Sequence, residues 1–346
     1  MKKAIYILFI TTIIILSGCK STTYLQIMRP AAVTVPQNIK AIALVNRTVP
    51  EKKGLNIIEG VLTGEGIGQD REGVQKAMDG LSQVLEESPR FTVKRTTEAL
   101  KNNFIAGGFT DPIPWPVIGN ICRRYETDAV LALEIFDSDF VTTHASKVVE
   151  KKDSDGNVRK VTEYNAEGVA SVKIGYRLYD LSTHTITDQQ EISQNHKWSA
   201  SGNSVKDALA HLLERRIAVN NVSYQSGRAY AQRIAPSWFT ASRVFYKKSK
   251  KNPNLALGAR QAAVGNWEEA AETWKQVLNN ADMKTAGKAA YNIALSYEVI
   301  GDLQSAKEWA SDAYATYNNK KARDYSRILD RRIWEQDKLD QQMNNQ

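Results

Sequence analysis

The stretch "DAVLALEIF", residues 128–136, decides the fold of the larger part of this chain. A near-continuous apolar run of this length predicts a strand that is covered on both faces. Two earlier segments, residues 39–45 and "RFTVKR", also predict short strands. Between them "DREGVQKAMDGLSQVLEES" places apolar residues at helical spacing, and a second helix carries Cys122. Strands that alternate with helices predict a layered α/β domain.

After Phe140 the pattern changes to long alternating strands. Alternation predicts antiparallel strands with one wet face, and "DSDGN" at residues 153–157 and Thr183-His184 predict the turns between them. Helices over residues 205–218 and 227–234 are expected to close the region. Ala170, Val172, Ile174, Tyr176 and Leu178 are expected on the apolar face of one strand.

The order of these motifs resembles the soluble domain of curli-secretion channel lipoproteins and the related domain of Tol-system periplasmic proteins. The likeness rests on "AIALVNRT", "LEESPRFTVKR", "YETDAVLALEI" and "IGYRLYDLSTHTI". With the repeats described below, the chain also resembles outer-membrane lipoproteins of Bacteroidota-type bacteria. The resemblance implies an α/β sandwich over residues 39–234, with a mixed sheet and a long antiparallel hairpin.

The resemblance to a channel raises the question of a pore. A membrane-spanning strand needs one face that suits lipid. In residues 141–150 and in the return strand both faces carry charged or polar side chains, including Lys147, Glu150 and Lys160. The hairpin is therefore not expected to span a bilayer.

The last third contains an internal repeat. "LALGARQAAVGNWEEAAETWKQVL" aligns with "YNIALSYEVIGDLQSAKEWASDA", so that Gly265 matches Gly301 and Ala270 matches Ala306. This resembles the tetratricopeptide repeat, in which glycine ends the first helix of each pair. Residues 254–341 are thus expected to form an all-α repeat domain, with residues 342–346 as a tail. Trp267 and Trp274 are expected in its packing, and Tyr325, Ile328, Leu329 and Ile333 on the buried face of a capping helix.

The first residues predict export. Lys2 and Lys3 precede an apolar run of about 13 residues, which is too short to span a bilayer. Leu16-Ser17-Gly18-Cys19 resembles the lipobox of bacterial lipoproteins, which implies cleavage after residue 18 and acylation of Cys19 by diacylglycerol and a fatty acid such as palmitate. The alternative is ordinary cleavage with a free thiol. Residues 19–38 are expected to be a tether.

Composition supports this picture. The chain of 346 residues has two cysteines, so an acylated Cys19 leaves Cys122 without a partner, as a buried apolar residue. The net charge of +8 falls by two with the signal. In an exported protein this favours anionic lipid or an acidic partner rather than nucleic acid. Residues 235–253 are expected to be a basic linker; alternatively, the run from Lys247 to Lys251 contacts headgroups with Phe245 and Tyr246.

No motif for chemistry is complete. Gly64, Gly66 and Gly68 precede a helix but lack the rest of a phosphate loop, and Asp153, Asp155 and Asn157 lack the rest of a calcium loop. The four histidines show no paired spacing, so neither a metal nor a cofactor is predicted. Glu134, Asp137 and Asp139 remain as acid-base candidates for a hydrolase.

The sequence therefore predicts an α+β protein without catalytic residues. We expect an outer-membrane lipoprotein that faces the periplasm, because the residues after Cys19 lack both an inner-membrane retention aspartate and an acidic surface-display run. Its expected partners are other envelope proteins, for which it acts as a binding or assembly scaffold. An oligomeric component of a secretion or transport system and a carboxylate-dependent hydrolase are the alternatives.

Overall fold

The computed structural model describes residues 20–50, 69–102, 108–152, 154, 156–249 and 252–344. They form two compact units. The helical unit combines residues 20–30 with residues 238–341, and the sheet unit is formed mainly by residues 31–237. The chain thus leaves the helical unit after its first strand and returns to it some two hundred residues later.

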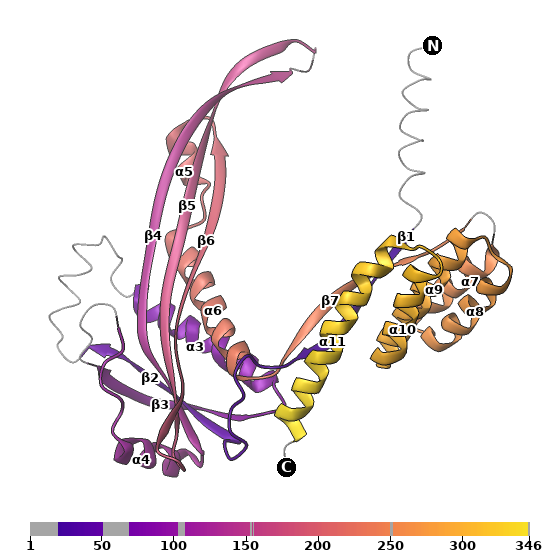
Figure 1. Ribbon diagram of the computed structural model, residues 1–346. Coiled ribbons are helices and arrows are strands. Elements are labelled where there is room, and N and C mark those ends of the chain that lie inside the picture. The colour runs from indigo at the N-terminus through magenta and orange to yellow at the C-terminus, as the bar shows by residue number, and fades with distance from the viewer. Residues whose placement is uncertain are drawn as a thin grey trace. The chain divides into compact units, whose positions relative to one another are not determined.

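The sheet unit is built on a five-stranded mixed sheet with the order β3-β2-β4-β5-β6. Strand β2 pairs in parallel with both β3 and β4, whereas β4, β5 and β6 are antiparallel neighbours (Figure 1). This confirms the predicted mixed sheet and its long hairpin. The strands are β2 (Ala41–Pro50), β3 (Thr92–Asn102), β4 (Ala129–Lys152), β5 (Val158–Asp180) and β6 (Thr185–Gly202).

Helices cover the central strands on both faces. Helices α3 (Gln69–Glu87) and α6 (Arg215–Ile234) pack on one face, where Leu131 and Leu133 are buried. Helix α4 (Trp115–Tyr125) packs on the other face, where Val130 and Cys122 are buried. Because alternate residues of β4 enter different cores, the apolar run from residue 128 is covered on both sides, as predicted.

The outer half of the β4–β5 hairpin is exposed. Beyond residue 141 of β4 and before residue 164 of β5, every side chain whose burial is defined is at least partly exposed. We call residues 141–152 and 158–163 the arm. One boundary in the sheet unit was predicted wrongly: the chain leaves the helical conformation after α5 (Val205–Ala210) and re-enters it at Arg215, because the backbone of Glu214 is extended (φ −57°, ψ 135°).

The helical unit begins with a strand where a tether was predicted. Strand β1 (Lys20–Arg29) pairs with β7 (Ser237–Tyr246), which occupies most of the predicted linker. The tether and the linker were predicted wrongly, because alternate residues of these polar segments are buried together. The buried residues are Leu25, Ile27 and Ala241. Phe245 is also buried, against Trp267 and Trp274, so it cannot face headgroups.

The remaining helices are α7 (Pro253–Ala263), α8 (Trp267–Asn280), α9 (Met283–Ile300), α10 (Leu303–Ala315) and α11 (Lys320–Asn344). Gly265 and Gly301 have left-handed backbones, with φ of 91° and 99°, and lie just after α7 and α9. The matched residues Ala270 and Ala306 are both fully buried. At these two matched pairs the backbone conformation and the burial are thus the same.

Helix α11 caps the repeats with Tyr325 and Leu329, but Ile328 is 43% exposed. The prediction that Ile328 is buried was wrong, because this position of the helix faces a groove described below. Helix α11 also continues to Asn344, into the segment expected to be a tail. Within the ranges given above, no helix has both the length and the apolar character needed to cross a membrane.

Candidate functional site

Several residues singled out in the sequence lie outside the described ranges. They are Cys19, the loop glycines Gly64, Gly66 and Gly68, and the turn residues Asp153 and Asp155. Gly156 is described, and its φ of 87° suits a tight hairpin turn between β4 and β5. Over the residues that the structure describes, no group of three His, Cys, Asp or Glu side chains is arranged to hold a metal ion.

Glu134 is a structural ion-pair residue in the sheet unit. Its side chain is fully buried at a break in the β4–β5 register. Arg47 and Arg177 each donate a hydrogen bond to one carboxylate oxygen, at 3.1 Å, and the Tyr179 hydroxyl donates to the other at 2.6 Å. Burial and this hydrogen bond raise the pKa of Tyr179 to about 12. The carboxylate is thus held by three donors and shielded from solvent.

The other two acid-base candidates are not in this cluster. Asp137 and Asp139 lie further along β4 and are exposed to solvent. In the β4–β5 register they are opposite Lys173 and Ser171. The structure therefore separates a buried, hydrogen-bonded carboxylate from two exposed ones, and does not assemble the three into one site.

Cys122 occupies the predicted buried position on α4. Burial raises the pKa of its thiol. A thiol with a raised pKa is mostly protonated at neutral pH and is a poor nucleophile. Its place in the core is therefore a packing role.

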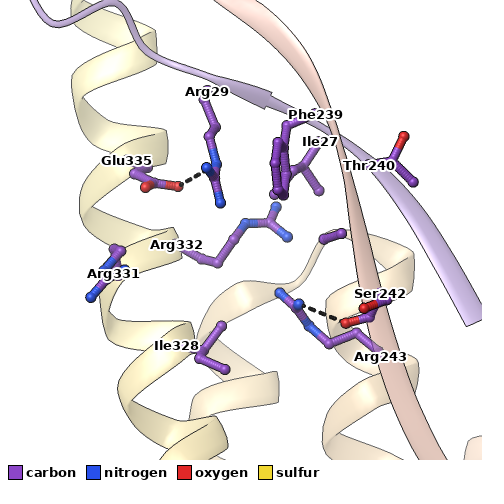
Figure 2. Close-up of a pocket in the computed structure, with 11 residues that line it drawn as sticks. Ile27, Arg29, Phe239, Thr240, Ser242, Arg243, Ile328, Arg331, Arg332 and Glu335 are labelled. Carbon is purple, nitrogen blue, oxygen red and sulfur yellow. Dashed lines mark hydrogen bonds and ion pairs between the residues drawn. The ribbon is translucent and has the colours of Figure 1, made fainter. Parts of the chain in front are cut away.

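One candidate binding site is a groove in the helical unit. It lies between the β1–β7 ribbon and α11, and has a volume of about 310 Å³ (Figure 2). Four arginines and one glutamate line it, so its lining carries a net positive charge. Its walls include Ile27, Phe239 and Ile328, and its charged residues are Arg29, Arg243, Arg331, Arg332 and Glu335.

Arg29 lies between Phe239 and Glu335 in the lining of the groove (Figure 2). Its guanidinium lies 3.7 Å from the ring centroid of Phe239, and its Nε is 3.9 Å from a carboxylate oxygen of Glu335. Arg29 and Phe239 come from the two strands of the ribbon, whereas Glu335 comes from α11 (Figure 2). The ion pair is long, and 45% of the Arg29 side chain is exposed against 16% of the Glu335 side chain, so the Arg29 guanidinium can also reach a ligand carboxylate from the solvent side.

Two arginines of the groove are held by Glu298, whose side chain is buried. Arg243 donates two hydrogen bonds to its carboxylate, at 2.8 and 2.7 Å, and Arg332 donates another at 2.8 Å. The Tyr325 hydroxyl donates at 2.7 Å. Burial opposes ionisation of Glu298, but Arg243 and the other donors hold its pKa below the ordinary value. Two groove arginines are therefore oriented by a charged partner behind them.

The groove combines fixed positive charge with apolar surface. Arg331 points away from its centre in Figure 2 and adds charge at the edge. Trp334, which lies beside this residue on α11, is 60% exposed, and Phe239 is 42% exposed. Arginines beside exposed aromatic rings fit a carboxylate or phosphate group attached to an apolar body.

Sequence reasoning missed this groove. Arg29 and Arg332 are far apart in the chain, and no local pattern connects them. One signal was available: Glu298 is the single acidic residue in the otherwise apolar end of α9, "IALSYEVI". A carboxylate at such a position predicts a buried ion pair.

Comparisons with known proteins identify two families. Residues 39–246, more than half of the chain, match a family described as a domain of unknown function, DUF8603. Residues 256–331 match a second such domain, DUF6340. No curated protein matches the chain.

The chain is distantly similar to two kinds of solved structure. The PelC dodecamer from Paraburkholderia phytofirmans has 12% identity and a TM-score of 0.23, with 62% of this chain and 98% of that chain covered. A putative neuraminyllactose-binding hemagglutinin homolog from Helicobacter pylori has 12% identity and a TM-score of 0.22, with 57% and 81% covered.

Proposed function

The chain belongs to the DUF8603 family, and from this premise we propose that it is a lipid-anchored cell-envelope protein that binds other envelope proteins without catalysing a reaction. The anchor is the acylated Cys19, and the chain faces the periplasm from the outer membrane. The sequence supports this with the motif Leu16-Ser17-Gly18-Cys19 and with the absence of an aspartate in the residues that follow.

The observation that carries the proposal is the groove between the β1–β7 ribbon and α11. Protein interfaces are enriched in arginine and aromatic residues, which often contribute most of the binding energy. Arg29, Arg331 and Phe239 present this combination to solvent. The positive charge of the lining selects an acidic segment of the partner, because complementary charge favours encounter and specificity.

The arrangement of the three candidate acid-base residues favours a binding function over hydrolysis. Glu134 receives hydrogen bonds from two arginines and a tyrosine, and the two exposed aspartates are not gathered with it. A general acid or base must reach a substrate proton. A carboxylate with no exposed surface serves the fold instead.

The experiment is crosslinking in cells from a photoreactive residue at position 328, followed by mass spectrometry. We expect an envelope protein with an acidic segment to be enriched. Reversing charge with Arg29→Glu and Arg331→Glu should reduce its recovery about tenfold or more, whereas Arg323→Glu, an exposed site on α11 outside the groove, should not. Recovery of no envelope protein above background would refute the binding role.

The anchor is tested separately. Cells grown with labelled palmitate should incorporate label into the chain, and Cys19→Ser should abolish the label and release the protein from the membrane fraction. Retention of both label and membrane association in this variant would contradict lipidation at Cys19.

A further inference from the structure

The helical unit begins directly after the proposed lipid anchor. Strand β1 starts at Lys20, the residue that follows Cys19 in the sequence. One extended residue spans only about 3.5 Å. With Cys19 acylated, the first residues of β1 therefore lie at the level of the lipid headgroups, and no long tether separates this unit from the membrane.

Three lysines gather at this end of the unit around the ring of Tyr246. The Lys20 ammonium is 6.0 Å from the ring centroid, and the Lys288 ammonium is 5.7 Å from it. Lys321, near the start of α11, lines a small hollow of about 30 Å³ together with Lys20 and Tyr246. The three ammonium groups come from β1, α9 and α11, so the fold and not a local run of sequence brings them together.

The hollow has positive side chains and no acidic one. Its described lining consists of Lys20, Val244, Phe245, Tyr246, Tyr291 and Lys321. The neighbouring Lys20 side chain, and then burial, lower the pKa of Lys321, which reflects two ammonium groups in one place. Two ammonium groups that lie close together repel each other, and an anion bound between them reduces this repulsion.

We propose that Lys20, Lys288 and Lys321 bind the phosphate groups of anionic phospholipids, so that this end of the helical unit lies on the membrane that holds the Cys19 lipid. The orientation on the membrane rests on the proposed anchor. This cluster differs from the run of Lys247 to Lys251 considered from the sequence: Phe245, which was expected at the interface beside that run, is buried, and residues 250–251 lie outside the described ranges. Tyr246 is partly buried and presents its ring to two of the lysines. Electrostatic attraction of each lysine to an anionic surface is worth about a fivefold change in binding.

The test uses the chain from position 19 onward with Cys19→Ser, which contains every described element and carries no lipid. It is mixed with vesicles of phosphatidylcholine alone or of phosphatidylcholine with phosphatidylglycerol, and the bound fraction is measured by sedimentation. We expect binding to the anionic vesicles only, with a decrease as salt is raised. The combined variant Lys20→Gln, Lys288→Gln and Lys321→Gln should bind about a hundredfold more weakly.

The matched control removes the same charge elsewhere in the helical unit, with Lys275→Gln, Lys307→Gln and Lys338→Gln. The affinity of this control variant for the anionic vesicles should fall by no more than about threefold. Equal loss in both variants, or equal binding to both kinds of vesicle, would overturn the proposal. Displacement by inorganic phosphate but not by chloride of equal ionic strength would assign the cluster to free phosphate instead. Because the protein in this assay has no lipid, failure of the anchor proposal leaves the result unaffected.

Discussion

The indole ring of Trp274 occupies the space that a side chain at Gly258 would need. A Cβ at Gly258 would lie 2.5 to 2.8 Å from three atoms of this ring. The ring is fixed in turn, because its N–H donates a hydrogen bond to the carbonyl of Leu255 at 3.1 Å. The close approach of α7 and α8 in the first repeat therefore depends on a glycine and a tryptophan together.

Gly258→Ala is expected to destabilise the helical unit by about 1–3 kcal/mol, because overpacking outweighs the gain in helix propensity. Denaturant unfolding and hydrogen exchange of α7 and α8 measure the change. Gly119→Ala is the control: it also lies in a helix, but its nearest neighbour would be at 3.7 Å. The packing argument is wrong if both variants have the same stability as the parent.

Glu298→Gln is expected to cost about 3–5 kcal/mol in the helical unit, since it leaves Arg243 and Arg332 buried without their negative partner. Faster hydrogen exchange in α9 and α11 would show the effect. Glu272→Gln removes only an exposed ion pair with Lys275 and should cost less than about 1 kcal/mol. A neutral effect of Glu298→Gln would contradict the role of this carboxylate in fixing the groove.

The same carboxylate predicts acid sensitivity. Its folded-state pKa is depressed below an ordinary value of 4.5, so its stabilising contribution is full above that value and is lost as the pH falls through the lower folded pKa. Stability of the parent should therefore fall below about pH 4.5, and by a smaller amount in Glu298→Gln. Unfolding curves from pH 3 to pH 7 measure the difference. If the free energy of unfolding depends on pH in the same way in both proteins, the Glu298 carboxylate is not the source of the acid sensitivity.

Glu134→Gln is expected to destabilise the sheet unit by about 3–5 kcal/mol, because Arg177 then loses a buried negative partner. Asp137→Asn and Asp139→Asn should stay within about 0.5 kcal/mol of the parent, as exposed residues usually do. Circular dichroism during thermal unfolding checks both. A hydrolytic activity that depends on Glu134 or Asp137 would instead favour the carboxylate-dependent alternative.

The arm is expected to serve a partner rather than the fold. Replacing residues 147–163 by an Asn-Gly turn between Ser146 and Tyr164, which are paired in the register, should change the free energy of unfolding by less than about 1 kcal/mol. Crosslinked proteins recovered from cells that carry the parent or this shortened variant are compared by mass spectrometry. An unchanged set would show that the arm does not select the partners.

The sequence predicts those parts of the fold that depend on local patterns. The buried strand at residues 128–136, the long hairpin and the glycines after α7 and α9 each leave a signal within a few residues. The β1–β7 ribbon leaves no comparable signal in the sequence. Its two strands are far apart in the chain, as the hydrogen bond between Gln26 and Thr240 across 214 residues shows. Both strands also look polar, because only alternate residues are buried. The groove depends on that ribbon, so its arginines could not be grouped from sequence alone.

The pairing of β1 with β7 has a consequence for the order of events as the chain is made. A chain exported from its amino terminus delivers β1 first, but β7 follows only after the whole sheet unit, and α11 later still. Acylation at Cys19, as proposed, would fix β1 at the bilayer before its partner strand exists. The helical unit would then be assembled at the membrane surface around a strand already held there, and a fragment limited to residues 256–331 would lack both strands of the ribbon.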